Sequence, residues 1–584
     1  MAGSIRLGVD VDRGHRPVML DPDFLRTHMH LVGATGAGKT TAIHALLRPL
    51  MKDHRRKCSM FVIDPMGNLS FDLLEWIASR KCPEHVRKRL VYIEPARENT
   101  VVPINPLRFV SEANRYYQVA RAVDLILRAW AAQDLGQQPR LMQWSYRAMC
   151  SMAAMGYPIS MSRFLLHPGS QEHHALLSKL PEEIRHHWQE ILNAKGSEAT
   201  RILESTRNRF DPFYESVVLR RMFGSTESHF DVERMIRERK IVIVNVAPMG
   251  RIPSQLGGTI GSLIVNEILE TARNMTTQYG RKSVEPTYLL LDEFQRFAAS
   301  PDIEDALPTV RQLGLRLILA HQSFSQLVQG DTDLTNMIWQ ARSRLMFANS
   351  AEDADVIANE LAVLTFDRFR IKQQLSNKRQ VVTGYRKEWL ESEGVSDTHS
   401  DGASEQFAFG YSSAVGDTSS SQGQQVSRRD TTGSNRNHGT GSNSSDSRSH
   451  NRGRSQSLVP IHETQEEVSS ITFESFDEHR LEWMKLVRQL KTGEAFGRFV
   501  DDERLYHLNI HYDPVRQTPS QQQRLQELLQ RNFEQDIFIS ADAADRLAEQ
   551  DRRRLLGSDR IILPAETADH TSPSDTSSDD QYFR

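Results

Sequence analysis

The sequence has few of the features that mark secreted or membrane-spanning proteins. Only three of its 584 residues are cysteines, and they lack the spacing of a disulfide framework or a metal site, which is typical of a reducing cytosol. No apolar run approaches the roughly 18 residues that a transmembrane helix needs. The opening residues, MAGSIRLGVD, have neither the basic segment nor the apolar core of a signal peptide. These absences predict a cytoplasmic protein without a transmembrane segment.

A strong net charge is also missing. The chain has 72 Lys and Arg against 75 Asp and Glu, a formal net charge of −3, so no global excess of positive charge marks a nucleic-acid binder. Any contact with DNA must therefore come from a local basic surface, such as a pore lining. The hydrophobic content of 39% and the charged content of 25% are ordinary for globular domains, and the length allows about three or four of them.

What the sequence does contain is a phosphate-binding loop that fits G-x-x-x-x-G-K-[ST]. The apolar run 29–32 predicts a strand before it, and residues 41–52 predict an amphipathic helix after it, whose N-terminus would face a nucleotide's phosphates. Lys39 would reach the β- and γ-phosphates, and Thr40 would bind Mg²⁺. The alternative, a glycine-rich turn that matches by chance, is disfavoured by these flanks. The expected nucleotide-binding residues are Gly33, Ala34, Thr35, Gly36, Ala37, Gly38, Lys39, Thr40 and Thr41.

The second half of a nucleotide site follows another apolar run, residues 287–291, which predicts a strand that ends in Asp292 and Glu293. In P-loop enzymes the first acid of such a pair holds the Mg²⁺ ion, and the second can polarise the attacking water. We therefore expect Asp292 on the metal side and Glu293 as the catalytic base. The alternative is a pair of merely solvated residues at a strand end.

Two further residues are candidates because of their position. Gln322 follows the predicted strand 315–321 at its C-terminal end, where open α/β sheets bind ligands, and could sense the γ-phosphate or orient water. Arg311 lies on the preceding helical segment and could reach a neighbour's nucleotide as an arginine finger. A solvated helix face is the alternative for Arg311.

The order of the segments predicts an α/β core interrupted by a helical insertion and followed by a linker. Strand-like and helix-like runs alternate before residue 112 and again after residue 223, whereas the region between them shows only helical periodicity. Residues 395–457 contain no Leu, Ile, Met, Trp or Cys and cannot bury enough apolar surface to order themselves. The expected parts are 1–112 and 223–390 as the two halves of an ATPase core, 113–222 as an all-helical insertion, 391–457 as a disordered Ser/Gly/Asn-rich linker, 458–515 as a closing segment that returns to the core, and 516–584 as C-terminal helices with a disordered tail.

Seven motifs along the chain, taken in their order, indicate a protein family and not only single sites. These motifs are GATGAGKTT, FVIDPMGN, INPL, IVIVNV, YLLLDEFQRF, VRQLGLRLILAHQS and SRLMFANSAEDADVIANEL. In this order they resemble the FtsK/HerA superfamily, and more closely the coupling-protein ATPases of conjugation and type IV secretion. The resemblance covers roughly residues 5–385 and, weakly, 458–512. The Asp-Pro-x-Gly motif at 64–67 is much more specific to this superfamily than the phosphate loop.

The resemblance implies a RecA-like P-loop NTPase core that forms a homohexameric ring, with ATP at subunit interfaces and DNA threaded through the centre. Lys39 and Thr40, the acid pair, and Gln322 fall on the family's motifs, and ATP and Mg²⁺ are the implied cofactors. Arg311 falls on the arginine between the acid pair and the glutamine, which favours the finger role. Arg344 is an alternative finger.

The predicted function is therefore an ATP-hydrolysing DNA translocase of the coupling-protein kind. Coupling proteins commonly carry N-terminal transmembrane helices, which this sequence lacks, so peripheral association with the inner membrane stays open. One alternative is a HerA-like ATPase that works with a nuclease in repair or phage defence, and another is a nucleotide-gated scaffold without motor activity. A relaxase, a secretion channel and a nuclease are the candidate protein partners. Arg251, in the loop 248–254, is a candidate pore residue that would contact DNA.

Overall fold

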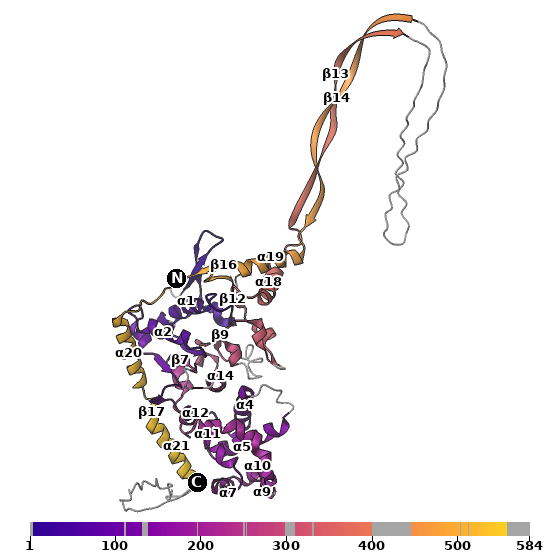
Figure 1. Ribbon diagram of the computed structural model, residues 1–584. Coiled ribbons are helices and arrows are strands. Elements are labelled where there is room, and N and C mark those ends of the chain that lie inside the picture. Colours follow the sequence, from indigo (N-terminus) through magenta and orange to yellow (C-terminus); the bar gives the residue numbers. More distant parts are fainter. Residues whose placement is uncertain are drawn as a thin grey trace, which may run out of the picture. The chain divides into compact units, whose positions relative to one another are not determined.

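The computed structural model consists of two compact units, residues 1–366 with 476–584 and residues 367–475 (Figure 1). It describes residues 4–55, 57–109, 112–130, 138–194, 197–248, 252, 254–297, 310–329, 332–399, 446–500, 502, 504–511 and 513–556. None of the helices in this described part is long and apolar enough to cross a bilayer.

The first unit is built on an 11-stranded sheet with the order β2-β1-β16-β15-β12-β3-β9-β8-β4-β7-β5. The strands from β12 to β5 are parallel to one another, whereas β15, β16, β1 and β2 continue the sheet in antiparallel pairs. The strands are β1 (Ile5–Asp10), β2 (Arg16–Leu20), β3 (Met29–Val32), β4 (Ser59–Asp64), β5 (Leu90–Ile93), β7 (Ile241–Asn245), β8 (Thr287–Leu291), β9 (Leu315–His321), β12 (Ser343–Phe347), β15 (Glu494–Arg498) and β16 (Leu505–Ile510).

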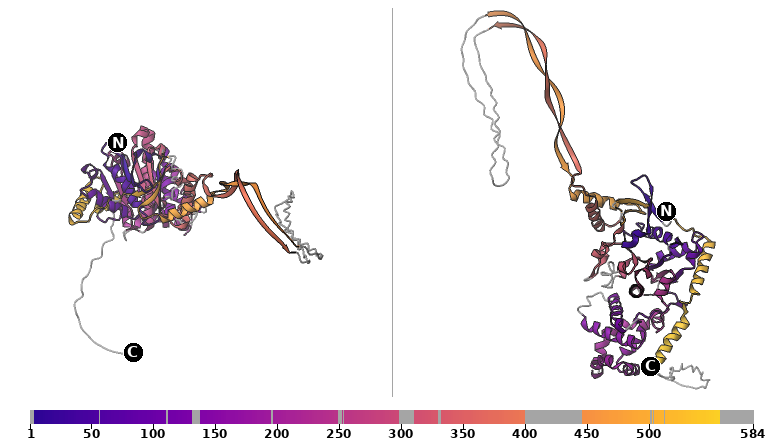
Figure 2. Two further views of the ribbon diagram at one scale, coloured as in Figure 1. Left: turned by 90° about the horizontal axis from the view of Figure 1, so that it is seen from above. Right: turned by 180° about the vertical axis from the view of Figure 1, so that it is seen from behind.

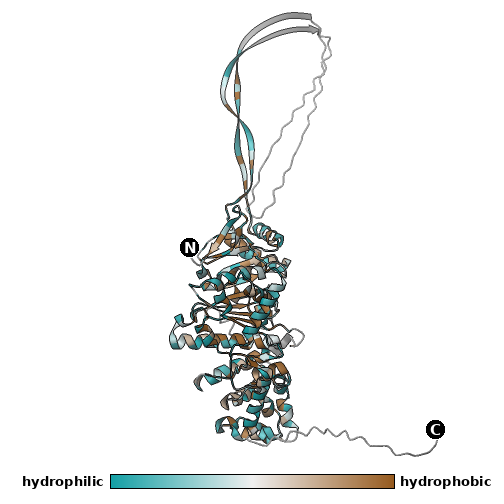
Figure 3. Ribbon diagram, turned by 90° about the vertical axis from the view of Figure 1, so that its left-hand side faces the viewer, coloured by the Kyte–Doolittle hydropathy of each residue, from teal (hydrophilic) through white to brown (hydrophobic). Residues whose placement is uncertain are grey.

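The parallel strands are buried because helices cover both faces of the sheet. Every residue of β3, β4, β7, β8 and β9 is buried. Successive residues of β4 enter different hydrophobic cores: Phe61 and Ile63 enter one, and Met60 and Val62 enter the other. Helices α1 (Lys39–Lys52) and α2 (Asn68–Ala78) supply the second core, and α14 (Ser254–Tyr279) supplies the first. This confirms the predicted α/β core, and the brown strands between partly teal helices in Figure 3 show the same layering.

Strand β9 lies between β3, which leads into the phosphate loop, and β8, which leads into the acid pair. One inserted strand between these two is the arrangement expected of a RecA-like core. It brings the C-terminal ends of β3, β9 and β8 to one edge of the sheet, so the loops that follow them can form a common site.

The region between β6 (Thr100–Val101) and β7 is helical in its described part, as predicted. Its described helices are α4 (Glu112–Trp130), α5 (Pro139–Ala154), η3 (Ile159–Met161), α6 (Ser162–Leu165), α7 (Gln171–Lys179), α8 (Glu182–His186), α9 (Gln189–Asn193), α10 (Glu198–Phe210), α11 (Pro212–Glu215), α12 (Val217–Phe223) and α13 (Val232–Arg237). Trp144 and Trp188 are fully buried within this insertion, with ring centroids 5.4 Å apart. Large aromatic side chains of this kind give the insertion a core of its own.

Shorter elements complete the core. They are η1 (Pro22–Thr27), α3 (Glu84–Arg87), η4 (Arg281–Ser283), η5 (Phe294–Arg296), η6 (Phe324–Leu327), β10 (Val328–Gln329), β11 (Thr332–Asp333), α17 (Thr335–Ile338), α18 (Ala351–Thr365) and α19 (Phe476–Gln489).

The C-terminal helices α20 (Pro519–Phe533) and α21 (Ala541–Leu556) join the edge of the sheet to the helical insertion (Figures 1 and 2). Asn532 covers the outer strand β5: its side chain donates to Tyr92 O at 2.8 Å and accepts from Tyr92 N at 2.7 Å. Strand β17 (Ile539–Ser540) pairs with β6. Asp545 of α21 forms an ion pair at 2.8 Å with Arg221 of the insertion. The C-terminal segment therefore protects an open sheet edge and braces the insertion.

The second unit is a long antiparallel hairpin of β13 (Ile371–His399) and β14 (Asp446–Phe473). Its ladder runs from the pair Ile371 and Phe473 to the pair His399 and Asp446. The strands thus include both ends of the predicted linker 391–457, whereas residues 400–445 lie outside the described part. Composition did not indicate these strands, because backbone pairing needs no apolar core, and polar pairs such as Lys378 and Glu466, 3.4 Å apart, suit an exposed ribbon.

Candidate nucleotide site

The phosphate loop connects β3 to α1 and needs its glycines. Gly36 and Gly38 have φ of +80° and +115°, conformations that residues with side chains rarely adopt. A side chain on Gly38 would also meet Gly493 N at 2.8 Å, and one on Gly33 would meet Phe347 Cβ at 2.5 Å. The loop is therefore shaped by backbone conformation and by close neighbours together.

Three segments distant in sequence hold this loop in place. Gly33 N donates to His321 O at the end of β9, at 3.4 Å, and Ala34 N donates to Ala348 O just after β12, at 2.9 Å. From the other side, Gly493 N donates to Ala37 O at 2.9 Å. The segment before β15 thus contacts the loop directly, because β15 pairs with β12.

Lys39 begins α1 and lies within the curve of the loop. Its Nζ donates to Gly33 O and, at 3.3 Å, to Ala34 O. Burial lowers the pKa of Lys39 from its ordinary value, whereas the negative charges of Glu293 and Asp292 act in the opposite direction. Thr40 and Thr41 follow in the first turn of α1 and are half-buried. The ammonium group is thus electrostatically coupled to both acids of the predicted pair.

The acid pair follows β8 in the same sheet as the loop. Burial is the main reason why the pKa of Asp292 rises to about 7; nearby Asp64 and Glu293 raise it further, and Lys39 lowers it. Glu293 is buried and takes a left-handed backbone conformation with φ 47° and ψ 50°, which is uncommon for a residue with a side chain and is concentrated at functional sites.

Gln322 connects the acid pair to the phosphate loop. Its Nε2 donates to Glu293 Oε1 at 2.8 Å, and its Oε1 accepts from Thr35 Oγ1 at 2.9 Å. A glutamine can serve both neighbours because its amide has a donor and an acceptor at one end. The structure therefore joins three of the residues singled out from the sequence in one hydrogen-bonded chain.

Gln295 is part of this network and was not found by the sequence analysis. Its Nε2 donates to Glu293 Oε2 at 2.8 Å and to Gln326 Oε1 at 3.0 Å. Both carboxylate oxygens of Glu293 thus accept from a glutamine amide. The only signal in the sequence was a glutamine in LDEFQRF, between two phenylalanines that the structure buries.

Asp64 of the Asp-Pro-x-Gly motif shapes the neighbouring turn. Its buried carboxylate accepts from the backbone N–H groups of Met66 at 2.9 Å, Gly67 at 2.8 Å and Ser70 at 2.7 Å, so it fixes the entry into α2. Because it also raises the pKa of Asp292, the motif contributes negative charge to the site as well as local structure.

Two buried histidines lie directly behind the site. His30 of β3 and His321 of β9 are stacked, and their Nε2 atoms are 2.7 Å apart. Burial lowers the pKa of both, that of His321 to about 3, so both rings are neutral at physiological pH. The pair links the strand that leads into the phosphate loop to the residue directly before Gln322.

The two candidate arginine fingers differ in their exposure and in their contacts. Arg311 is exposed on the helical turn before β9. Arg344 is buried, pairs with Glu360 and donates from Nε to Ala341 O at 3.0 Å, so it is engaged within its own subunit. The candidate pore residue Arg251 lies outside the described residues.

The residues present fit a magnesium-bound nucleotide. Asp292, Glu293 and Asp64 concentrate three carboxylates near one ammonium; burial is the largest cause of the raised pKa of Asp292, and the charges of Asp64 and Glu293 add to it. Oxygen ligands are those that Mg²⁺ prefers. The loop places the N-terminus of the 14-residue helix α1 beside them, which suits phosphate groups.

Comparisons with known proteins agree with this geometry. The family described as "Type IV secretory system Conjugative DNA transfer" matches residues 172–384, which include the acid pair and Gln322. The family described as "Helicase HerA, central domain" matches residues 5–268, which include the phosphate loop. None of the curated proteins matches the chain.

Among solved structures, similar chains include the coupling protein TrwB and VirB4. The unbound bacterial conjugative coupling protein TrwBΔN70 is 13% identical, with 88% of this chain and 91% of that chain covered and a TM-score of 0.45. The plasmid coupling protein TrwB in complex with ADP and Mg²⁺ is 13% identical, with 86% and 90% covered and a TM-score of 0.45. VirB4 of Thermoanaerobacter pseudethanolicus is 11% identical, with 89% and 99% covered and a TM-score of 0.41. Because these TM-scores are below 0.5, we draw no conclusion about this chain from the structural similarity.

The family matches and the site geometry are consistent with each other. One match contains the loop, the other contains the acids, and the sheet brings the two together. The predicted resemblance is therefore confirmed: the chain is similar to the conjugative DNA transfer family of type IV secretion over residues 172–384 and to the central domain of the helicase HerA over residues 5–268.

Proposed function

We propose that this protein is an ATP-driven DNA translocase. The observation that carries the proposal is the chain of hydrogen bonds from Thr35 through Gln322 to Glu293. It joins the group that would hold phosphates to the group that would activate water, so that occupation of the loop can be sensed at the catalytic carboxylate.

Each residue then has a defined task. The loop amides and Lys39 bind the phosphates of ATP, and Thr40 and Asp292 hold Mg²⁺, which would neutralise phosphate charge. Glu293 accepts a proton from the attacking water. Gln322 is the γ-phosphate sensor, because it bonds both Glu293 and the loop. Gln295 is a positioning residue that keeps the Glu293 side chain in one orientation.

The motor is proposed to be a homohexamer in which Arg311 acts on the nucleotide of a neighbouring subunit. Its exposure on the helical turn before β9 supports this role, and the engagement of Arg344 with Glu360 makes Arg344 the less suitable candidate. DNA is the proposed cargo because one matched family is described by conjugative DNA transfer and the other by the helicase HerA. A relaxase and a secretion channel, at the inner membrane, are the proposed partners.

The proposal is tested on the full chain by three measurements. Native mass measurement in the presence of Mg·ATP should give six subunits. ATP hydrolysis should rise severalfold when DNA is added, and the protein should displace a third strand from triplex DNA in an ATP-dependent manner. ATP binding without stimulation by DNA would contradict the motor and favour a nucleotide-gated scaffold.

The HerA match favours a second candidate function, a DNA-processing ATPase that works with a nuclease. Both candidates use the same ATP site, so variants of that site do not separate them. Affinity purification from the native host does: a nuclease retained at constant ratio supports the second function, and a relaxase supports the first.

A further inference from the structure

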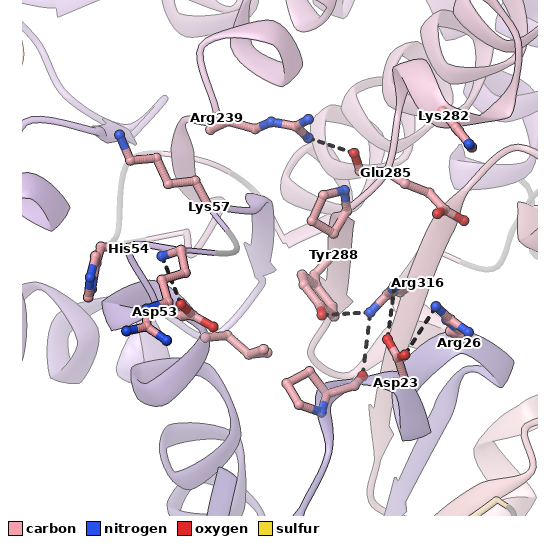
Figure 4. Close-up of a pocket in the computed structure, with 14 residues that line it drawn as sticks. Asp23, Arg26, Asp53, His54, Lys57, Arg239, Lys282, Glu285, Tyr288 and Arg316 are labelled. Carbon is pink, nitrogen blue, oxygen red and sulfur yellow. Dashed lines mark hydrogen bonds and ion pairs between the residues drawn. The ribbon is translucent and has the colours of Figure 1, made fainter. Parts of the chain in front are cut away.

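A basic cavity lies at the edge of the sheet opposite the nucleotide site. Its volume is about 820 Å³, and 14 residues line it: Pro22, Asp23, Arg26, Leu50, Asp53, His54, Arg55, Lys57, Arg239, Lys282, Glu285, Pro286, Tyr288 and Arg316 (Figure 4). These residues lie in or just before the N-terminal halves of β3, β4, β7, β8 and β9, whereas the phosphate loop and the acid pair follow C-terminal ends. No residue of the proposed ATP site lines the cavity.

The charge of the cavity is opposite in sign to that of the chain. Six Lys or Arg residues and three carboxylates line it, although the formal net charge of the protein is −3. One carboxylate is engaged, since Asp23 pairs with Arg26 at 3.0 Å and lies 3.7 Å from Arg316. Within the described part of the chain, no carboxylate lies within ion-pair distance of Lys57 or Lys282. Their ammonium groups are therefore available to a ligand.

A buried arginine forms one wall of the cavity. Arg316 donates from Nη1 to the Tyr288 hydroxyl at 2.9 Å and to Pro22 O at 3.4 Å, as the dashed lines in Figure 4 show. Its Nε is buried and has no hydrogen-bond partner in the structure. A buried donor without a partner is costly, and a ligand with acceptor oxygens would relieve that cost.

A purely structural explanation of these cations is not sufficient. Helices α1, α13 and α14 end at Lys52, Arg237 and Tyr279, next to the cavity, and basic residues stabilise helix C-termini. Each such end carries about half a negative charge, so three of them contribute about −1.5. Together with three carboxylates this still leaves the six cations in excess.

The same helix ends indicate what kind of anion fits. Sites for free phosphate or a mononucleotide use backbone N–H groups at helix N-termini, and this edge presents helix C-termini instead. Of the apolar lining residues, Leu50, Pro22 and Tyr288 are buried and Pro286 is partly exposed, so little apolar surface is offered to a bilayer. What remains is a group of separate cationic side chains, which is how proteins contact the phosphates of a nucleic-acid backbone without reading sequence.

We propose that this cavity binds the phosphate backbone of DNA. This inference rests on the proposed function, because the choice of DNA as the nucleic acid comes from the proposal that the ATPase moves DNA. Lys57, Lys282 and Arg316 are its central contacts. Because the cavity lies across the sheet from the ATP site, DNA bound there neither competes with nucleotide nor requires it.

The test is DNA binding by the full chain without nucleotide, as a function of salt. The probe is a fluorescein-labelled single-stranded oligonucleotide read by anisotropy. The variant is Lys57→Ala with Lys282→Ala, and the matched control is Lys485→Ala with Arg516→Ala, which removes two exposed cations outside the cavity. Each lost phosphate contact lowers the slope of log K against log [salt] by about 0.7, so the double variant should lose about 1.4 of slope and bind about tenfold more weakly near 0.15 M salt.

The control variant should bind as the wild type does, and the cavity variant should keep wild-type ATP hydrolysis in the absence of DNA. A cavity variant with the slope of the wild type would overturn the inference and leave the ATPase untouched. Absence of DNA binding by the wild type would overturn both this inference and the proposed cargo. Pyrophosphate or anionic vesicles are the two remaining probes: loss of their binding in the cavity variant, with DNA binding unchanged, would also refute a DNA site.

Discussion

The two edges of the parallel sheet are chemically opposite. At the C-terminal edge, backbone amides and the N-terminus of α1 surround a site whose side chains are mainly acids and glutamines. At the N-terminal edge, helix C-termini meet a cavity in which cationic side chains are in excess. The first edge can bind phosphates through the backbone and supply acids for a metal, whereas the second can bind them only through side chains. The same sheet thus carries one site suited to ATP hydrolysis and one suited to binding the backbone of DNA.

Replacing Lys39 should have the largest effect on ATP hydrolysis, and that effect should be limited to the C-terminal edge of the sheet. Lys39→Ala removes the ammonium coupled to both acids, and loss of such charge stabilisation costs on the order of a hundredfold to a thousandfold in turnover. Lys52→Ala, at the exposed other end of α1, is the matched control. Steady-state ATP hydrolysis decides: near-normal turnover by Lys39→Ala would remove the basis for the assigned site.

Strand β8 offers the sharpest comparison, because it has a glutamate near each end. Glu293→Gln removes the proposed base and should lower turnover on the order of a hundredfold, while binding of a fluorescent ATP analogue persists. Glu285→Gln, at the cavity edge, removes one negative charge without touching the ATP site, so hydrolysis should be unchanged and DNA binding slightly tighter. Equal effects of the two substitutions on hydrolysis would contradict the assignment of ATP hydrolysis to the C-terminal edge alone.

Gln295 should have a smaller effect on the same edge. Gln295→Ala removes the amide on Glu293 Oε2, which we expect to lower kcat about tenfold with little change in KM, because positioning and not substrate binding is lost. Gln295→Glu should be worse than Gln295→Ala, since it places a second carboxylate beside Glu293. Rates that are the same for both variants and the wild type would assign the Gln295 bond to folding alone.

The contrast between the edges also explains what the sequence could and could not reveal. Residues 33–40 were recognisable because glycines, a lysine and a threonine at fixed spacing are needed together in this backbone shape. Asp292 and Glu293 were recognisable because a phosphate loop precedes them in the chain, and a P-loop site needs an acid pair at the end of a core strand. Gln295 was not, because its importance comes only from folding next to Gln326 and Glu293.

The basic cavity was invisible in the sequence for a related reason. Its cations come from segments that begin different strands, and the chain as a whole carries 72 Lys and Arg against 75 Asp and Glu. Only the strand order, with β9 inserted between β3 and β8, brings Arg26, Lys282 and Arg316 to one place. Composition likewise could not indicate the ladder that includes residues 391–399 and 446–457, since strand pairing depends on a partner 47 to 69 residues away along the chain.

The acidity of Asp292 gives a pH test of the C-terminal edge. Its pKa of about 7 lies above that of an aspartate in an unfolded chain, so the folded protein holds an extra proton between about pH 4 and 7. Stability from this group is complete at the acidic end and is lost as the pH rises through 7. Asp292→Asn should therefore have a higher Tm than the wild type at pH 8 without Mg²⁺, and the gap should shrink as the pH falls from 7 and close near pH 4. A constant gap, measured by thermal unfolding, would contradict the raised pKa.

The smallest effect is expected at the cavity edge. Tyr288→Phe removes the hydroxyl that accepts from Arg316 Nη1, and loss of one such hydrogen bond costs about 1–2 kcal/mol in free energy of unfolding, measured with urea. Hydrolysis of ATP should not change, although Tyr288 lies on the strand that leads to the acid pair, because every residue of β8 is buried in the core and Phe fills the same space as Tyr. A fall in turnover comparable to that of Gln295→Ala would show that the two edges communicate through β8, and the separation of chemistry from attachment would then have to be abandoned.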